Sequence, residues 1–292
     1  MSRAILAYPN FVDASPTYAT VAFSGGTWLA GLPLTNLASP LLVKRARSVG
    51  VTLTATQFWV DLGVSRGVRV AAIPFLTASR DCRVRVRGFT VKNAAAPAVA
   101  DTGWKALYPA IYPDGVLDYG DPAWWDRRLS AEDVGTYPVP FVATFAPVAY
   151  ARYWLVEIDD SASTLGYVDV PRIFLAPGWR VSVNPQYGAQ LGFESRTSGA
   201  ESWGGAIFYD VQTGRRTMQF ELDIPEAEAL SQAFDMQRRL DISGQLFWIH
   251  NPDDTLHLHR RSFLATMKEL SALEYTSFGR MKPTFQLSEV IA

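Results

Sequence analysis

All three histidines of this chain lie in one short stretch with two aspartates: His250, Asp253, Asp254, His257 and His259. Imidazole and carboxylate groups are ligands for zinc and related metals, so the stretch raises the question of a metal site. The alternation in residues 245–249 and 255–259 instead predicts two strands of a β-hairpin, with its turn over 251–254. In that hairpin Trp248 faces His257 on the polar side. We therefore expect an ordinary hairpin without a metal, and no other cofactor.

Aspartates and serines in turns supply the remaining candidates for chemistry. Five aspartates carry the oxygen ligands that calcium prefers: Asp114, Asp118, Asp121, Asp159 and Asp160. They lack EF-hand spacing and each also fits a turn, so a structural calcium stays an open question. Ser24 and Ser202 precede glycines but lack the strand-to-helix turn that a nucleophile needs. Cys82 is the single cysteine, which excludes an intrachain disulfide. With no convergent catalytic set, we expect the protein not to be an enzyme.

Residues 93–140 form a long segment that is rich in alanine and proline at its start and then in aromatic residues and prolines. A segment of this length in a compact domain usually has a function or belongs to an interface. Two interpretations stand: an aromatic flap that closes one side of a β-sandwich core, or a surface that binds a partner. We take seven residues as candidate interface or glycan contacts: Tyr108, Tyr112, Tyr119, Trp124, Trp125, Trp248 and His257.

The elements that position these residues are predicted to be mostly strands. Alternation over residues 58–62 and 68–73 predicts two strands, with Gly63–Gly67 as the turn between them. Arg83–Arg87 alternates arginine with valine, which predicts a strand with one basic, solvated face. Further strands are expected over residues 141–145, 152–158, 167–174, 217–222, 245–249, 263–267 and 284–291.

One helix is predicted, over about residues 225–240. Pro225 suits a first turn, Glu226 and Glu228 lie at the positive end of the helix dipole, and Arg238 and Arg239 lie at the negative end. Five residues recur at helical spacing and are expected to form the buried stripe: Ala227, Leu230, Ala233, Phe234 and Leu240.

The order of motifs in the first half resembles a galactose-binding-like jelly roll of the discoidin or coagulation-factor C-domain type. The resemblance lies in Gln57–Gly63 (QFWVDLG), Arg152–Asp159 (RYWLVEID) and Tyr167–Phe174 (YVDVPRIF). It covers about residues 1–176 and implies a β-sandwich whose variable loops bind sugars or lipids in the family. The aromatic segment 93–140 departs from the family pattern as an insertion.

Ala176–Gly178 is typical of a linker, so a second domain is expected over residues 177–292. This half resembles phage tail proteins of the distal-tail and minor-tail type. The resemblance lies in Arg215–Leu222, the helix from Pro225, Gly244–Ile249 with the Asn-Pro-Asp-Asp turn after it, and Phe285–Val290. It implies a β-domain with one packed helix that forms rings or hubs at a tail tip.

Charge and hydropathy limit the kinds of partner. The 27 basic and 28 acidic residues nearly cancel, so we expect no nucleic-acid partner. Residues 14–43 are uncharged, but prolines and glycines interrupt them, so we expect no membrane span. The apolar run after Arg3 is too short for a signal peptide, and we expect synthesis in the host cytoplasm.

These observations predict a mainly β protein: an N-terminal jelly-roll β-sandwich and a C-terminal β-domain with one packed α-helix. The expected function is that of a structural component of a phage, or phage-derived, tail tip or baseplate. Its partners are then copies of itself in a symmetric ring and other tail proteins, and its place is the virion tail tip. The alternative is a carbohydrate-binding module that recognises a host-surface glycan through Trp124 and Trp125. The nine tryptophans favour an exposed aromatic interface in either case.

Overall fold

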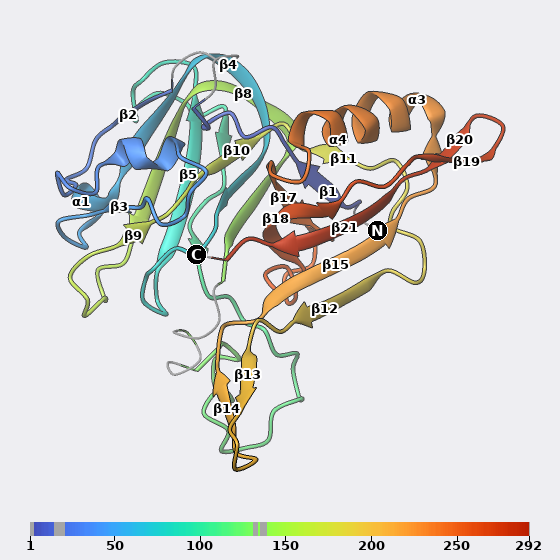
Figure 1. Cartoon of the computed structure of the whole chain (residues 1–292). Helices are drawn as coiled ribbons and strands as arrows, with labels where there is room; N and C mark the ends of the chain where they lie inside the picture. The colour runs from blue at the N-terminus through green and yellow to red at the C-terminus, as the bar shows by residue number, and fades with distance from the viewer. Residues whose placement is uncertain (1–2, 15–20, 131–133, 135–138, 292) are drawn as a thin grey trace. The chain divides into compact units, whose positions relative to one another are not determined.

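The computed structural model describes residues 3–14, 21–130, 134 and 139–291. The described chain is mainly β, with two large antiparallel sheets and a 15-residue helical segment over residues 226–240, which confirms the predicted fold class. It divides into two compact units (Figure 1). Unit 1 comprises residues 1–180 and 247–263, and unit 2 comprises residues 181–246 and 264–291. Unit 1 thus includes a segment, 247–263, that the sequence analysis assigned to the C-terminal domain.

The main sheet of unit 1 has the strand order β10-β4-β8-β5-β6, with β2 also paired to β4 and β7 to β5. Its strands are β2 (Ala22–Ser24), β4 (Phe58–Ile73), β5 (Arg83–Phe89), β6 (Ala100–Asp101), β7 (Lys105–Ala106), β8 (Phe141–Asp159) and β10 (Phe174–Ala176). Shorter elements of the same unit are η1 (Leu34–Ala38), α1 (Leu53–Thr56), and the paired β3 (Ala46–Arg47) and β9 (Asp169–Val170).

Strand β4 runs without interruption through the turn that was predicted at Gly63–Gly67, so that prediction is wrong. β4 pairs with β8, and the register shifts between Asp61 and Arg66 and again between Val68 and Val70. At the first shift β4 has the extra residues, and at the second shift β8 has them. The pairing of β4 with β8 resumes after each bulge. The Asp61 carboxylate accepts the N–H of Gly63 at 2.8 Å, and Gly63 has a φ of 76°. A side chain would be strained there, and glycine is not.

Strand β5 confirms the predicted alternation over Arg83–Arg87. Val84 and Val86 are fully buried in the core of unit 1. The arginines on the other face are paired with carboxylates: Arg83 with Asp159 at 2.7 Å, and Arg87 with Glu157 at 2.8 Å. The basic face is therefore neutralised by neighbouring strands.

A second group of strands in unit 1 consists of β1 (Ile5–Ala7), β11 (Trp179–Arg180) and β17 (Gln245–Ile249). β1 pairs antiparallel with both of the others. Along β17, residues 246–249 are completely buried. Both faces of this strand are thus covered, and the expected polar face does not exist.

Unit 2 contains a sheet with the order β18-β21-β15-β12. These strands are β12 (Gln190–Glu194), β15 (Arg215–Glu221), β18 (Ser262–Glu269) and β21 (Thr284–Glu289). A small sheet joins β16 (Ile224–Pro225), β20 (Arg280–Lys282) and β19 (Glu274–Ser277). The hairpin β13 (Ser198–Glu201) and β14 (Ile207–Asp210) forms a two-stranded sheet of its own.

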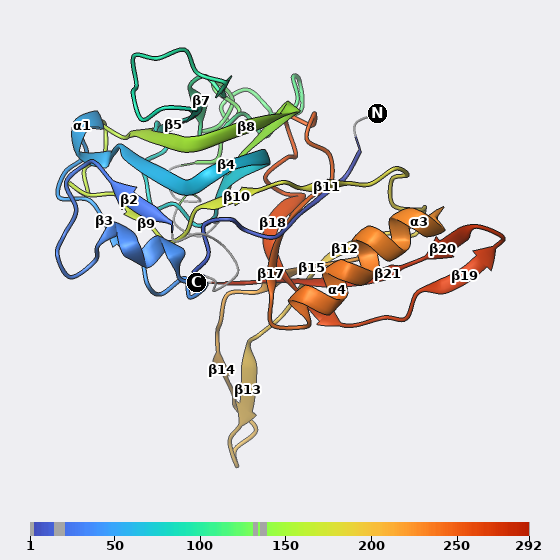
Figure 2. The same cartoon turned by 90° about the horizontal axis from the view of Figure 1, so that it is seen from above.

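The predicted helix exists, but only Ala233 of its predicted buried stripe is fully buried. It consists of α3 (Glu226–Glu228), the π-helical segment η2 (Ala229–Phe234) and α4 (Asp235–Leu240), and it lies against one face of the unit 2 sheet (Figure 1, Figure 2). Ala229, Ala233 and Met236 are fully buried. Leu230 is 45% exposed and Phe234 51% exposed, so these two form an apolar ridge on the outer side.

Candidate interaction surfaces

The segment between β7 and β8 is anchored to unit 1 at its start. Leu107 N–H donates to the carbonyl of Cys82 at 2.9 Å, and Tyr108 and Ile111 are buried in or beside the core. Burial raises the pKa of Tyr108 to about 12. Tyr108 is a core residue and is removed from the candidate contacts. Tyr112, the next tyrosine, is half-buried, with the guanidinium of Arg260 6.0 Å from its ring centre.

The same segment is closed on itself by hydrogen bonds around Arg127. The Arg127 carbonyl accepts the N–H of Ile111 at 2.7 Å and of Tyr112 at 3.2 Å, while its own N–H donates to the Ala123 carbonyl. Arg127 has a φ of 57° and its side chain pairs with Asp114. Residues 111–127 therefore form a loop whose two ends are joined by hydrogen bonds.

Ion pairs tie the end of this loop to the turn before β5. Asp126 binds Arg80 at 2.6 Å, and Arg128 binds Asp81 at 3.1 Å. Arg128 also donates to the Arg80 carbonyl at 3.2 Å. Bidentate and networked arginine pairs fix geometry better than isolated ones. These contacts therefore fix the end of the loop against the turn before β5.

An aromatic cluster made of Tyr119, Trp124 and Trp125 lies on this loop. Trp124 is half-buried and contacts both neighbours edge-to-face, with ring centroids 5.2 Å from Tyr119 and 4.7 Å from Trp125. Tyr119 is 84% exposed and Trp125 82% exposed. Asp121 holds the turn between them by accepting the N–H of Ala123 at 2.8 Å. The rings of Tyr119 and Trp125 are therefore exposed to solvent, and both contact the indole of Trp124 between them.

The two other candidate contacts lie elsewhere in unit 1. Trp248 is fully buried in β17, so it offers no surface to a partner. His257 is half-buried, and it lies in a run of turns over residues 251–260, not in a strand. The first predicted strand, 245–249, is confirmed as β17, but the predicted return strand 255–259 is wrong. Asp254 accepts the N–H groups of Leu256 and His257, and the His257 carbonyl accepts those of Arg260 and Arg261. These bonds use the backbone groups that a return strand would need, and the return strand starts at Ser262.

Metal ligands do not converge in the part of the chain that the structure describes: no group of three or more histidine, cysteine or acidic side chains could hold an ion there. Two of the carboxylates considered for calcium have other partners. Asp159 pairs with Arg83, and Asp160 accepts the N–H of Ser79 at 3.1 Å. Likewise, none of the helices within the described ranges is long and apolar enough to cross a membrane.

Unit 2 carries an exposed apolar surface on the β13–β14 hairpin, which we call the arm. All eight of its strand residues are exposed, including Ile207, Phe208 and Tyr209. Trp203, in the turn at its tip, is completely exposed. Figure 1 shows the arm projecting from the end of the unit 2 sheet. The sequence analysis did not identify these residues, although three consecutive apolar residues beside a Ser-Gly-rich turn were a visible signal.

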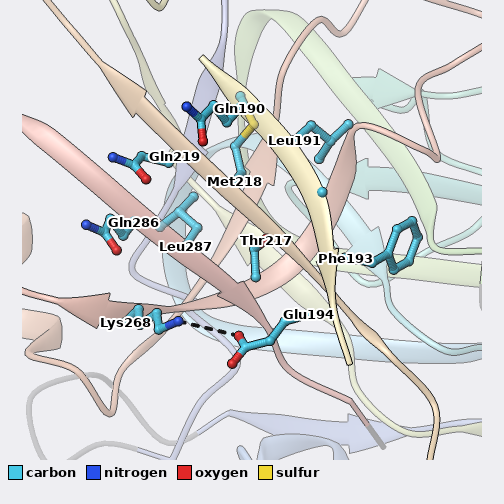
Figure 3. Close-up of a pocket in the computed structure, with 11 residues that line it drawn as sticks. Gln190, Leu191, Phe193, Glu194, Thr217, Met218, Gln219, Lys268, Gln286 and Leu287 are labelled. Carbon is cyan, nitrogen blue, oxygen red and sulfur yellow. Dashed lines mark ion pairs between the residues drawn. The ribbon is translucent and has the colours of Figure 1, made fainter. Parts of the chain in front are cut away.

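A groove of about 360 Å³ runs across the unit 2 sheet beside its edge strand β12. Gln190, Gln219 and Gln286 are in register on three adjacent strands and line one side of it. On the other side Lys268, at a β-bulge in β18, reaches Glu194 of β12 at 3.5 Å. Figure 3 shows the three amides aligned, with the Lys268–Glu194 pair below them.

The floor of the groove is open above Gly192. A Cβ atom there would contact only the Thr217 hydroxyl, at 3.9 Å. The groove therefore has room for a side chain that this chain does not itself supply.

Neither a protein-family model nor a curated protein matches the sequence. Among solved structures, the family 32 carbohydrate-binding module of NanJ from Clostridium perfringens, in complex with galactose, is 10% identical with a TM-score of 0.33; the alignment covers 53% of this chain and 92% of that one. The lectin domain of Lectinolysin, complexed with Lewis B antigen, is 13% identical with a TM-score of 0.36, covering 60% of this chain and 99% of that one.

A family 89 glycoside hydrolase from Clostridium perfringens, in complex with its substrate GlcNAc-α-1,4-galactose, is 11% identical with a TM-score of 0.35. That alignment covers 57% of this chain but 14% of the hydrolase. All three alignments have identities below 15% and TM-scores below 0.5, so they are distant likenesses.

Proposed function

We propose that this protein is a structural component that works by assembling, with copies of itself and with other proteins, in the tail tip or baseplate of a tailed phage or a phage-derived particle. The observation that carries the proposal is the exposed arm. Two-stranded hairpins are marginally stable alone in water, and contiguous exposed apolar side chains mark protein–protein contacts. The resemblance of residues 177–292 to tail-hub domains supplies the setting.

The arm is large enough to matter energetically. An aromatic side chain buries about 150–250 Å², and Phe208 and Tyr209 are both about two-thirds exposed. At about 25 cal/mol per Å², covering the two rings contributes roughly 5–8 kcal/mol before association costs. Those costs are about 4–15 kcal/mol, so one arm contact alone is marginal. Repetition of the contact around a closed ring removes exposed edges and adds further contacts for each subunit.

Purified particles test this proposal. Mass spectrometry should find the protein as a low-copy virion component, and cryo-electron microscopy should place it near the tail tip. Its absence from particles that contain the other tail proteins would refute the proposal.

The aromatic cluster favours a second candidate function, recognition of a host-surface glycan. Sugar rings stack on exposed aromatic rings, and Tyr119 and Trp125 carry such rings on a loop that hydrogen bonds and ion pairs hold in place. Galactose and Lewis B antigen, the sugars in two of the distantly similar structures, are the first probes to use.

Glycan-array and calorimetric measurements compare the wild type with Tyr119→Ala and Trp125→Ala. Each variant should weaken binding at least about fivefold, because stacking on an aromatic ring is worth about 1 kcal/mol or more. Trp104→Ala, in the same unit but outside the cluster, is the matched control and should bind as the wild type does. Equal binding by all four proteins would place any glycan site elsewhere.

A further inference from the structure

The unit 2 sheet ends in an unprotected edge. β12 pairs with β15 on one side and with no other strand in the described part of the chain. Natural edge strands are usually blocked by proline, lysine or a bulge, and Gln190–Glu194 has none of these. Leu191 and Phe193 are exposed on one face of β12, and Gly192 opens into the groove on the other. Such an edge is a template for an added strand.

The arm carries the matching edge. β14 pairs with β13 alone among the described strands, so its outer backbone groups are also unpaired. The chain's own β14 is a poor partner for its own β12, because only residues 195–197 separate β12 from β13. Folding the arm back would bring β13 to the edge, not β14. A strand that adds to the β12 edge would therefore have to come from another molecule.

We propose that the arm of one copy adds to the β12 edge of a second copy, with β14 antiparallel to β12 and Phe208 opposite Gly192. This inference rests on the proposed assembly function and names its surface. Side chains alternate between the faces of a strand, so Phe208 enters the groove above Gly192 while Ile207 and Tyr209 cover Phe193 and Leu191. An aromatic ring over a strand glycine is a stable cross-strand pair.

The arm already contains one pair of that kind. Tyr209 lies opposite Gly199 within the hairpin, and its ring is 3.2 Å from the position of a Cβ on that glycine. The groove offers Phe208 the same arrangement, with the alkyl parts of Gln190 and Gln219 beside the ring.

Charge selects the antiparallel direction. With Phe208 opposite Gly192, an antiparallel strand places Asp210 beside the Gln190 amide. A parallel strand would place Asp210 beside Glu194, and like charges directly opposite are destabilising. A hydrogen bond from Arg215 lowers the pKa of Glu194, which favours its charged form further.

The contact is head-to-tail, since arm and edge are different surfaces of one chain. Each copy therefore donates one arm and accepts one. This property gives a mixing experiment. Phe193→Lys blocks the edge and keeps the arm, whereas Phe208→Lys blocks the arm and keeps the edge. Both positions are about two-thirds exposed or more, so neither substitution disturbs the fold.

Sedimentation velocity on the full chain reads the result. The wild type should form species larger than a dimer. Each variant alone should need a concentration at least about tenfold higher than the wild type to assemble. A mixture of the two variants should form a 1:1 dimer and nothing larger. Phe278→Lys, at a fully exposed aromatic position outside both surfaces, is the control and should assemble as the wild type does.

Cysteine cross-linking reads the register. A protein with Leu191→Cys should form a disulfide with a protein carrying Tyr209→Cys, because residues directly opposite bring their Cβ atoms within reach. The combination of Leu191→Cys with Ile207→Cys, opposite only in the parallel arrangement, should cross-link far less. The native Cys82 is buried and does not interfere.

The outcomes separate this inference from the proposed function. If the wild type assembles and both lysine variants assemble equally well, assembly stands and the arm-to-edge contact is refuted. If the wild type is a monomer at every concentration, self-association through this edge is refuted, and particle proteomics still decides the structural role. Preferential cross-linking of the parallel pair would refute the proposed strand direction.

Discussion

Removing the carboxylate of Glu289 should destabilise unit 2 more than any single surface substitution. Glu289 on β21 and Arg216 on β15 form an ion pair whose side chains are each 5% exposed. One carboxylate oxygen accepts the backbone N–H and the Nε of Arg216, both at 2.9 Å, and the other accepts from Nη2. Glu289→Ala would remove the buried carboxylate that pairs with this guanidinium.

The expected loss is about 3–5 kcal/mol, the range for breaking one partner of a buried pair. A typical domain has about 5–15 kcal/mol in total, so the loss is a large share of the stability of unit 2. Glu194→Ala is the matched control: its pair with Arg215 is about one-third exposed, and such pairs contribute about 0–1 kcal/mol. The double variant Arg216→Met with Glu289→Leu should recover most of the loss, because it removes both charges.

Hydrogen exchange of the β15 and β21 amides under mild urea is the suitable assay. It reports the opening of unit 2 separately, which matters because a chain with two compact units need not unfold in one step. If Glu289→Ala and Glu194→Ala both lose less than about 1 kcal/mol, or if the double variant is as unstable as Glu289→Ala, the reasoning about this pair is wrong.

On the helix, Met236→Ala should lower the free energy of unfolding by about 2–5 kcal/mol, because Met236 is buried. Phe234→Ala should lower it by about 1 kcal/mol or less, because Phe234 is exposed. Chemical denaturation of both variants shows which one loses more stability. Gly26→Ala should destabilise unit 1 by at least about 1 kcal/mol in thermal melts, because φ is 66° and the added Cβ would lie 2.6 Å or less from three atoms. A hydrogen bond from Arg152 lowers the pKa of Asp61. The pair therefore stabilises the fold at pH values above the ordinary pKa of an aspartate, and this stabilisation is lost as the pH falls below about 4. Arg152→Met should therefore melt at a lower temperature at pH 7 and show a smaller difference from the wild type at pH 3; an equal difference at both would contradict the assignment.

Much of the fold follows from local pattern. Val84 and Val86 alternate with arginines, and that period of two places them in the core, as the structure confirms. The helix also follows from its end signals. Its buried face does not, because two apolar stripes lie side by side on it. Ala229 and Ala233 are small enough for close approach to the sheet, and the π-helical segment shifts the phase of the residues after it.

Side-chain bonds to the backbone account for the other differences. Asp254 holds a run of turns after β17, so the return strand begins at Ser262 and not at Thr255; nothing in the alternation of Leu256 and Leu258 distinguishes the two outcomes. The aromatic segment was identified from composition alone, but composition does not separate the buried Tyr108 from the exposed Tyr119 and Trp125. That separation depends on the Arg127 hydrogen bonds, which join residues far apart in the loop.

The return of residues 247–263 to unit 1 affects the order in which the protein can form during synthesis. β1 needs β17 as well as β11, so unit 1 lacks a strand until the ribosome has passed residue 263. At about 5–20 residues per second, the roughly 80 residues after Arg180 take about 4–16 s to emerge. During that interval the apolar edge of β1 is open to solvent. The nascent chain is thus exposed to chaperones, and to mispairing on the polysome, for longer than two consecutive domains of the same size would be.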